Sequence, residues 1–316
     1  MRSPSRDRRA LAGFIIAVIV VIIVVVALLA LIIVPFREAS IDEARQAPLV
    51  EGVESLNLTI EMDRGSVEVR FIDNATNAVA MSVRGTERSG LLGPGEQANV
   101  TWADSSSGNE QVVTASVRLG NNQGLFFTSN INCTVLIAKQ LRTALTVTNG
   151  LGAVEVVADD GVVLTSADIR ASTGGARLVM GANATLDGPL TMETSLGGID
   201  LEWTDAVATD AARFALRATT GGINVDIFQY EPLGESVTVN ATSNLGGINL
   251  AMDLRGNNSA RVQSSAQLGG VNVERQDGFE GTNEDLSSQN YPDAHAFEAV
   301  CHAETGGVNL DLRYSG

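Results

Sequence analysis

A pair of glycines followed by an apolar residue recurs along the second half of this chain, and it constrains the fold more than any other feature. The pairs begin at residues 174, 197, 221, 246, 269 and 306, so the successive intervals are 23, 24, 25, 23 and 37 residues. An earlier relative, LGAVEVV, occupies residues 151–157, and a fainter one, RGSVEVR, occupies residues 64–70. A nearly fixed period of this size is typical of a repetitive architecture.

Each repeat predicts two strands joined by a glycine corner. After the glycines, Ile223, Val225 and Ile227 alternate with polar residues, which is the period of a strand with one buried face. Residues 237–243 alternate in the same way before the next pair. Glycine permits a positive φ and a close approach of neighbouring backbones. The predicted corner glycines are Gly174, Gly175, Gly197, Gly198, Gly221, Gly222, Gly246, Gly247, Gly269, Gly270, Gly306 and Gly307.

Stacking of like on like is the arrangement that equal spacing favours. The first apolar residue of each unit would then form one interior column, made of Ile199, Ile223, Ile248, Val271 and Val308. The next residue is always Asn or Asp, and stacked amides hydrogen-bond along such a row. The predicted ladder is Asp200, Asn224, Asn249, Asn272 and Asn309. The rival interpretation is a set of two-residue hairpin turns in a β-sandwich, because Gly-Gly also builds that turn.

Composition agrees with an all-β fold and limits the classes of molecule that the chain is expected to bind. Aromatic residues make up 4% of the chain and there are 32 glycines, which suits many short strands. The net charge is −16, and because the first 34 residues carry +3, the remainder carries −19. A surface this acidic repels phosphate backbones, so nucleic acid is not an expected partner.

Residues 11–34 contain no charge and are predicted to form a transmembrane helix. The run is longer than the apolar region of a cleaved signal peptide. Four arginines precede it, so we expect a cytoplasmic N-terminus and an extracellular remainder in the cell membrane. The predicted regions are a basic tail (1–10), the transmembrane helix (11–34), a stalk (35–52), an N-terminal β region with insertions (53–145) and the Gly-Gly repeat (146–316).

Two further features bear on an extracellular location. Seven glycosylation sequons occur, at Asn57, Asn74, Asn99, Asn132, Asn183, Asn240 and Asn257. Thr-rich strands and Asn-rich turns also produce such sequons by accident. Cys133 and Cys301 each lie in an alternating strand pattern, so two buried free thiols and one disulfide are both open.

The stretches SLNLTIEMDRGSVEVRFIDNATNAVAMSVRG and NCTVLIAKQLRTALTVTNGLGAVEV, with the GGIN and GGVN repeats, resemble the auto-transporter adhesin families of bacteria and archaea, including the head GIN domain family. The resemblance covers about residues 53–316. It implies a right-handed parallel β-helix, here with coils of about 23 to 25 residues, and an adhesin-like role at the cell surface.

Insertions depart from that pattern at residues 73–130 and 274–298. The second is acidic and contains Tyr291 and His295, the candidate binding loop, although a solvated loop without a binding role would have the same composition.

The sequence contains no nucleophile elbow, phosphate-binding loop or zinc spacing, so we expect no enzyme, no cofactor and no metal site. Two alternative interpretations of the acidic residues remain. Asp200, Asp226 and Asp311 would be the acids of a carbohydrate-active β-helix enzyme. Glu284, Asp285 and Asp293 would be calcium ligands.

These features predict an adhesin-like binding or envelope scaffold module, with surface glycans or envelope proteins as partners. An envelope-sensing regulatory protein that works through membrane partners is the alternative. The last coil, residues 306–316, shows no capping element, so self-association through the solenoid ends is also expected.

Overall fold

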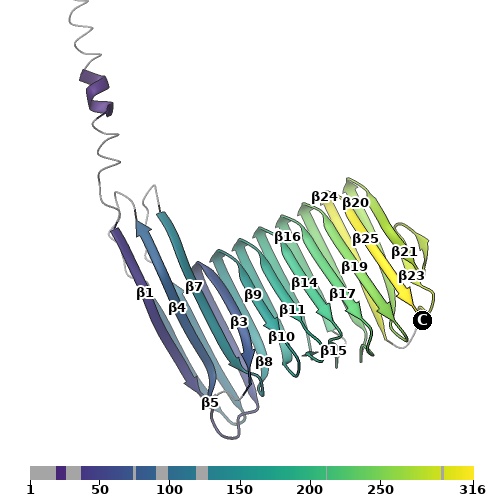
Figure 1. The fold of residues 1–316 in the computed structure, drawn as a ribbon, viewed down its shortest axis with the longest axis horizontal. Helices are drawn as coiled ribbons and strands as arrows, with labels where there is room; N and C mark the ends of the chain where they lie inside the picture. The colour runs from purple at the N-terminus through teal and green to yellow at the C-terminus, as the bar shows by residue number, and fades with distance from the viewer. Residues whose placement is uncertain are drawn as a thin grey trace, which may run out of the picture.

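The computed structural model describes residues 19–25, 37–73, 76–89, 99–118, 127–210, 212–292 and 295–316. Residues 19–25 are helical, and most of the predicted span at 11–34 lies outside the described residues. Within the described ranges, no helix has the length and apolar character that crossing a membrane requires. Almost everything else is β-strand, arranged in two sheets that face each other (Figure 1).

Sheet 1 contains eleven strands. In spatial order they are β1 (Arg37–Pro48), β4 (Asn77–Ser89), β7 (Phe127–Ala138), β3 (Ser66–Ile72), β9 (Val154–Ala158), β11 (Ala176–Met180), β14 (Ile199–Thr204), β17 (Ile223–Gln229), β19 (Ile248–Arg255), β25 (Val308–Ser315) and β21 (Val271–Asp277).

Sheet 2 contains fourteen strands. Twelve follow in spatial order: β22 (Phe279–Thr282), β23 (Asp285–Ser288), β20 (Ser259–Leu268), β24 (Ala296–Thr305), β18 (Val237–Leu245), β16 (Ala212–Thr220), β13 (Leu190–Leu196), β10 (Val163–Thr173), β8 (Arg142–Leu151), β2 (Ser55–Arg64), β6 (Glu110–Arg118) and β5 (Asn99–Ser107). The short strands β12 (Thr185–Leu186) and β15 (Val207–Ala208) pair with each other beside β10.

Parallel pairing through the middle of both sheets confirms stacking of like on like. Ile199 pairs with Ile223, and Ile223 pairs with Ile248, with their side chains fully buried. Each coil therefore consists of a strand in sheet 2, a glycine corner and a strand in sheet 1. The hairpin alternative is wrong for these repeats, because the strands on either side of each corner lie in different sheets. The handedness of the coils stays a prediction.

One apolar core runs between the two sheets, built from the inward residue of every alternating pair. Its bulkiest members lie near the middle of the stack. The ring centroids of Trp203 and Phe214 are 5.3 Å apart, and those of Trp203 and Phe297 are 6.4 Å apart. Trp203 Nε1 donates a 2.7 Å hydrogen bond to Gln229 Oε1, which satisfies two buried polar groups.

The order of the coils departs from the order of the chain at both ends. Near the C-terminus, β24 lies between β18 and β20, and β25 lies between β19 and β21. The last coil is thus an internal one, and the expectation that it leaves an open strand edge is wrong. The chain skips one position after β19, forms the outer coil of β20 and β21, and returns through the insertion to fill the gap.

Antiparallel strands flank the parallel stack at its ends. The insertion at 274–298 folds back as the hairpin β22–β23, which pairs with β20, and its Phe279 and Leu286 are buried. At the other end, β5 pairs with β6, and β4 pairs with both β7 and β1. The segment predicted to be a stalk therefore forms an edge strand over Arg37–Pro48, where Ile41 and Ala47 turn into the core.

Candidate functional site

The corner glycines are where predicted residues and geometry agree most closely. The first glycine of each pair has a positive φ, for example +147° at Gly197 and +138° at Gly221. A Cβ on Gly197 would collide with the carbonyl oxygen of Gly174 in the neighbouring coil. The Gly197 amide also donates a 2.8 Å hydrogen bond to the Thr220 carbonyl of the next coil. Both the backbone conformation and the close stacking thus require glycine.

The amide ladder forms on the outer face of sheet 1. Asn224 Nδ2 donates to Asp200 Oδ1 at 2.7 Å, Asn249 Nδ2 donates to Asn224 at 2.8 Å, and Asn309 Nδ2 donates to Asn249 at 2.9 Å. Asn272 completes the row, in register with Asn309. Asn309 therefore stands between Asn249 and Asn272, in an order that the chain does not follow.

The acidic residues suggested as catalytic candidates are spread over two rows of this face. Asp200 lies in the amide row, whereas Asp226 lies in the adjacent row, where it pairs with Glu202. Burial first, and then the charges of Glu202 and Asp200, raise the pKa of Asp226. Asp311 is in register with Ala251 and Arg275, two coils beyond Asp226, so the structure does not bring these three carboxylates together.

The candidate binding loop belongs to the insertion at 274–298, whose hairpin β22–β23 covers the end of sheet 2 and is called the cap. Tyr291 donates its hydroxyl to Glu298 Oε1 at 3.2 Å, and His295 follows within the same connection to β24. Arg261 of β20 forms a two-bonded ion pair with Asp285, at 2.9 and 2.7 Å, which fixes the hairpin to the sheet. Asp285 is therefore already engaged, and Asp293 lies outside the described residues. Across the described ranges, no group of three or more His, Cys, Asp or Glu residues is arranged to hold a metal.

The two cysteines are free and buried, in β7 and β24 near opposite ends of the stack. Burial raises the pKa of both thiols to about 12. Six of the seven sequon asparagines are exposed, and Asn74 lies outside the described residues. Their glycosylation stays a prediction.

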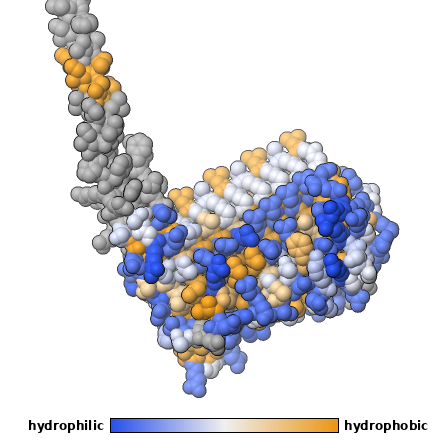
Figure 2. All heavy atoms as spheres, viewed as in Figure 1, coloured by the Kyte–Doolittle hydropathy of each residue, from blue (hydrophilic) through white to orange (hydrophobic). Residues whose placement is uncertain are grey.

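A feature that the sequence analysis missed lies immediately before the glycine corners. The last residue of each sheet 2 strand that leads into a glycine corner stands outside the core. Leucines occupy several of these positions, with exposed fractions of 39% at Leu151, 55% at Leu196, 53% at Leu245 and 67% at Leu268. Figure 2 shows hydrophobic spots at regular intervals along one rim of the stack, with paler surface between them. The signal was visible as the residue preceding each Gly-Gly, which is always Leu or Thr.

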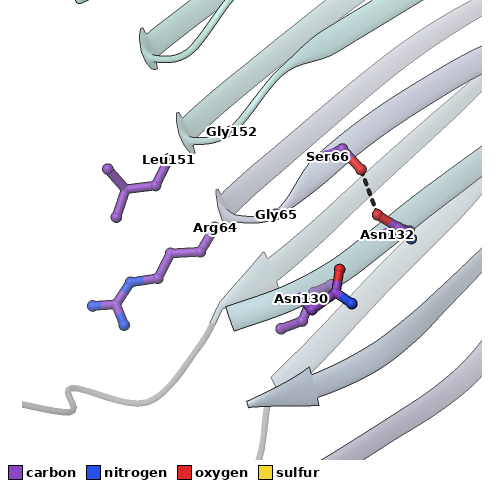
Figure 3. Close-up of a pocket in the computed structure, with 8 residues that line it drawn as sticks. Arg64, Gly65, Ser66, Asn130, Asn132, Leu151 and Gly152 are labelled. Carbon is purple, nitrogen blue, oxygen red and sulfur yellow. Dashed lines mark hydrogen bonds between the residues drawn. The ribbon is translucent and has the colours of Figure 1, made fainter. Parts of the chain in front are cut away.

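A hollow of about 370 Å³ lies at the end of this rim. It is lined by Arg64, Gly65, Ser66, Asn130, Ile131, Asn132, Leu151 and Gly152. Figure 3 shows the Arg64 and Leu151 side chains projecting to the same side of adjacent glycine corners. Across the hollow, Ser66 Oγ donates a 2.6 Å hydrogen bond to Asn132 Oδ1.

Comparison with known proteins gives two distant structural similarities. No protein-family model and no curated protein matches this sequence. The fold is similar to that of a candidate cell adhesion protein from Clostridium sporogenes, at 12% identity and a TM-score of 0.42, over 88% of this chain and all of that one. A candidate adhesin from Bacteroides fragilis is similar at 8% identity and a TM-score of 0.34, over 86% of this chain and 97% of that one. Likenesses this distant do not say what the chain binds.

Proposed function

We propose that this chain is an adhesin-like binding or scaffold module, a right-handed β-solenoid carried at the cell surface by an N-terminal membrane anchor. The observation that carries the proposal is the amide row of sheet 1, in which Asp200, Asn224, Asn249 and Asn309 are hydrogen-bonded into one line. A line of similar polar groups at the strand spacing of about 4.8 Å is a surface on which an extended partner can make the same kind of contact repeatedly.

Rigidity supports the same function. Every interior strand is hydrogen-bonded on both sides, so the exposed rows keep their spacing without a ligand. A preorganised surface loses little conformational entropy when it binds, which favours recognition by many weak contacts. The partners we propose are surface glycans or envelope proteins. The proposed role is binding and not catalysis. The carboxylates of sheet 1 lie on an open face, and several form ion pairs with arginines, as Glu155 and Glu202 do with Arg177.

The test is binding of the full chain, held in a lipid nanodisc, to isolated envelope and to a glycan panel. We expect saturable binding that falls at least tenfold in the double variant Asn224→Ala/Asn249→Ala. The matched control is Asn240→Ala, which removes an exposed amide from sheet 2 and leaves the row intact. Deleting the 274–298 insertion is a poor test, because Phe279 and Leu286 of the cap are buried in the core.

Two results would count against the proposal. Absence of saturable binding by the folded wild-type chain would favour the envelope-sensing alternative, which predicts that exchanging residues 11–34 for an unrelated anchor abolishes the phenotype. Equal losses in the row variant and the Asn240 control would show that binding does not depend on the amide row.

A further inference from the structure

The rim before the glycine corners carries a strict two-coil pattern. Its residues are in register as Leu151, Thr173, Leu196, Thr220, Leu245, Thr305 and Leu268. We call these seven positions the corner ridge. Leucine and threonine alternate without exception along it, over about 29 Å at a strand spacing of about 4.8 Å.

Leucine and threonine alternate in the order of the stacked coils, but not in the order of the chain. In chain order, Leu245 is followed by Leu268 and then by Thr305, so two leucines are consecutive. The return of β24 to a place between β18 and β20 inserts Thr305 between them. Internal packing does not demand such a pattern, because the interior column stacks Ile199, Ile223 and Ile248 directly on one another.

The corner ridge is also almost free of charge. Each corner comprises the ridge residue, the residue before it and the two after it, and in all seven corners Glu304 is the one charged residue. The whole chain carries a net charge of −16, so most of its surface repels a second copy. Association through the ridge avoids that repulsion. Single exposed leucines are ordinary, but a straight row of four with threonine methyl groups between them is a continuous apolar strip.

We propose that the corner ridge pairs with the corner ridge of a second copy, antiparallel and displaced by one coil, so that every leucine except the terminal Leu268 meets a threonine. A second copy necessarily has the same spacing between coils, so the contacts repeat in register along the ridge. The short threonine leaves room for the opposing leucine. The pairing is also reciprocal, as a twofold interface requires, because Leu196 of each copy faces Thr220 of the other. A lipid surface has no such period, and a glycan presents mainly hydroxyl groups, which need hydrogen-bonding partners that an apolar strip does not supply.

Charge favours the antiparallel direction. Arg64 precedes Leu151 in the register and ends the ridge at the N-terminal side, whereas Glu304 flanks Thr305 near the other end. When Leu196 faces Thr220 of the second copy, Leu151 faces Thr305 of that copy. Arg64, one coil beyond Leu151, then lies within one coil spacing of Glu304 of the second copy. Parallel pairing would keep these two charges at opposite ends.

The contact is narrow and therefore weak for a single pair. A strip one corner wide buries less than the roughly 800 Å² per partner of a standard stable interface. Many copies on one surface would add their contacts, so the avidity of the surface would exceed the affinity of the pair. If the proposed surface anchor is correct, antiparallel pairing also joins copies from opposing surfaces, because it places the two N-terminal ends apart.

The test measures self-association of the full chain at one copy per lipid nanodisc, by sedimentation over a range of concentrations. We expect reversible pairs of discs for the wild type. Thr220→Leu is the decisive variant, since it adds apolar surface but removes the space for the opposing leucine. Pairing by complementarity predicts at least a tenfold weaker association, whereas nonspecific apolar adhesion predicts a stronger one.

Further variants locate the contact. Leu196→Ser/Leu245→Ser is expected to weaken association at least tenfold, while Val300→Ser, which removes a 41% exposed valine of sheet 2 outside the ridge, stays within twofold of the wild type. A Leu196→Cys copy mixed with a Thr220→Cys copy is expected to form an oxidative crosslink, and a Thr173→Cys copy mixed with a Thr220→Cys copy is not. The native thiols do not interfere, because both are buried.

Several outcomes would overturn the proposal. A monomeric wild type at all concentrations would do so, as would stronger association of Thr220→Leu. Association that survives both ridge changes would point to the free edge of β21 at the end of the stack. Envelope or glycan binding through the amide row can persist in each of these cases, so failure here is distinct from failure of the proposed function.

Discussion

Leu245 pairs with Thr305, sixty residues later in the chain, and not with Leu268 of the following Gly-Gly unit. The same exchange puts Val308 next to Ile248 in the core and Asn309 next to Asn249 in the amide row. The change in coil order therefore leaves the core column and the amide row continuous, and it makes the ridge alternate. A chain whose last coil simply followed the previous one would bring Leu245 against Leu268 and break the alternation of the ridge.

The first prediction concerns the corner glycines. Gly197→Ala should lower the free energy of unfolding by at least about 2 kcal/mol, because it adds the cost of a positive φ to a collision with the Gly174 carbonyl. Gly270→Ala is the matched control at the end of the stack, where a Cβ would meet nothing within 4 Å. Urea titration followed by circular dichroism measures both. Equal effects in the two variants would show that close stacking is not the reason for glycine.

A second prediction addresses the amide row. Asn249→Ala removes one hydrogen bond to Asn224 and one from Asn309, so we expect a loss of about 1 to 2 kcal/mol in unfolding free energy. Asn272→Ala, at the end of the row, should cost less than about 0.5 kcal/mol. Urea titration measures the unfolding free energy of both variants. An unchanged value for Asn249→Ala would show that the hydrogen bonds of the row do not stabilise the fold.

The buried Trp203 and Gln229 pair gives a third prediction. Trp203→Phe leaves the Gln229 amide without its indole partner in the core, and we expect a cost of about 2 to 3 kcal/mol from lost volume and an unsatisfied polar group. Gln229→Met in the Trp203→Phe background should recover about 1 kcal/mol. A double-mutant cycle of unfolding free energies measures the coupling, and a coupling near zero would contradict this account.

The thiols provide a fourth prediction, on pH. Their pKa rises from 9.0 to about 12 on folding, so the folded state holds these protons more tightly than the unfolded state. The resulting stability is complete below pH 9 and is lost as the pH rises toward 12, by about 2 kcal/mol per thiol at pH 10.5. Unfolding of the wild type and of Cys133→Ala/Cys301→Ala at pH 8 and pH 10.5 tests this. The double variant should lose less stability over that interval, and an equal loss would refute the assignment to the thiols.

Thiol reactivity checks the same burial independently. At pH 8, the folded chain should react with a thiol reagent far more slowly than the chain in denaturant. In denaturant, two thiols per chain should react. Rapid reaction of either cysteine in the folded chain would show that the coil containing it opens locally.

Local repetition allowed the sequence to predict much of this molecule. The glycine corners, the two strands of each repeat, the column beginning at Ile199 and the amide row at Asp200 all follow from patterns confined to one unit of about 24 residues. Periodicity of two specifies which side chains face the core, and a glycine pair specifies where the chain must turn sharply. These features depend on neighbours along the chain, so one sequence sufficed to predict them.

Coil order was decided only by the tertiary structure. Because all the repeats share one register, any coil can stack on any other, and local pattern does not determine which lies next to which. The position of β24 and β25 depends on the length of the 274–298 insertion and on its hairpin covering the end of sheet 2. Edge strand β1 likewise forms because β4 offers it a partner. The alternation of Leu245, Thr305 and Leu268 is therefore a property of the folded stack, and the linear sequence does not contain it.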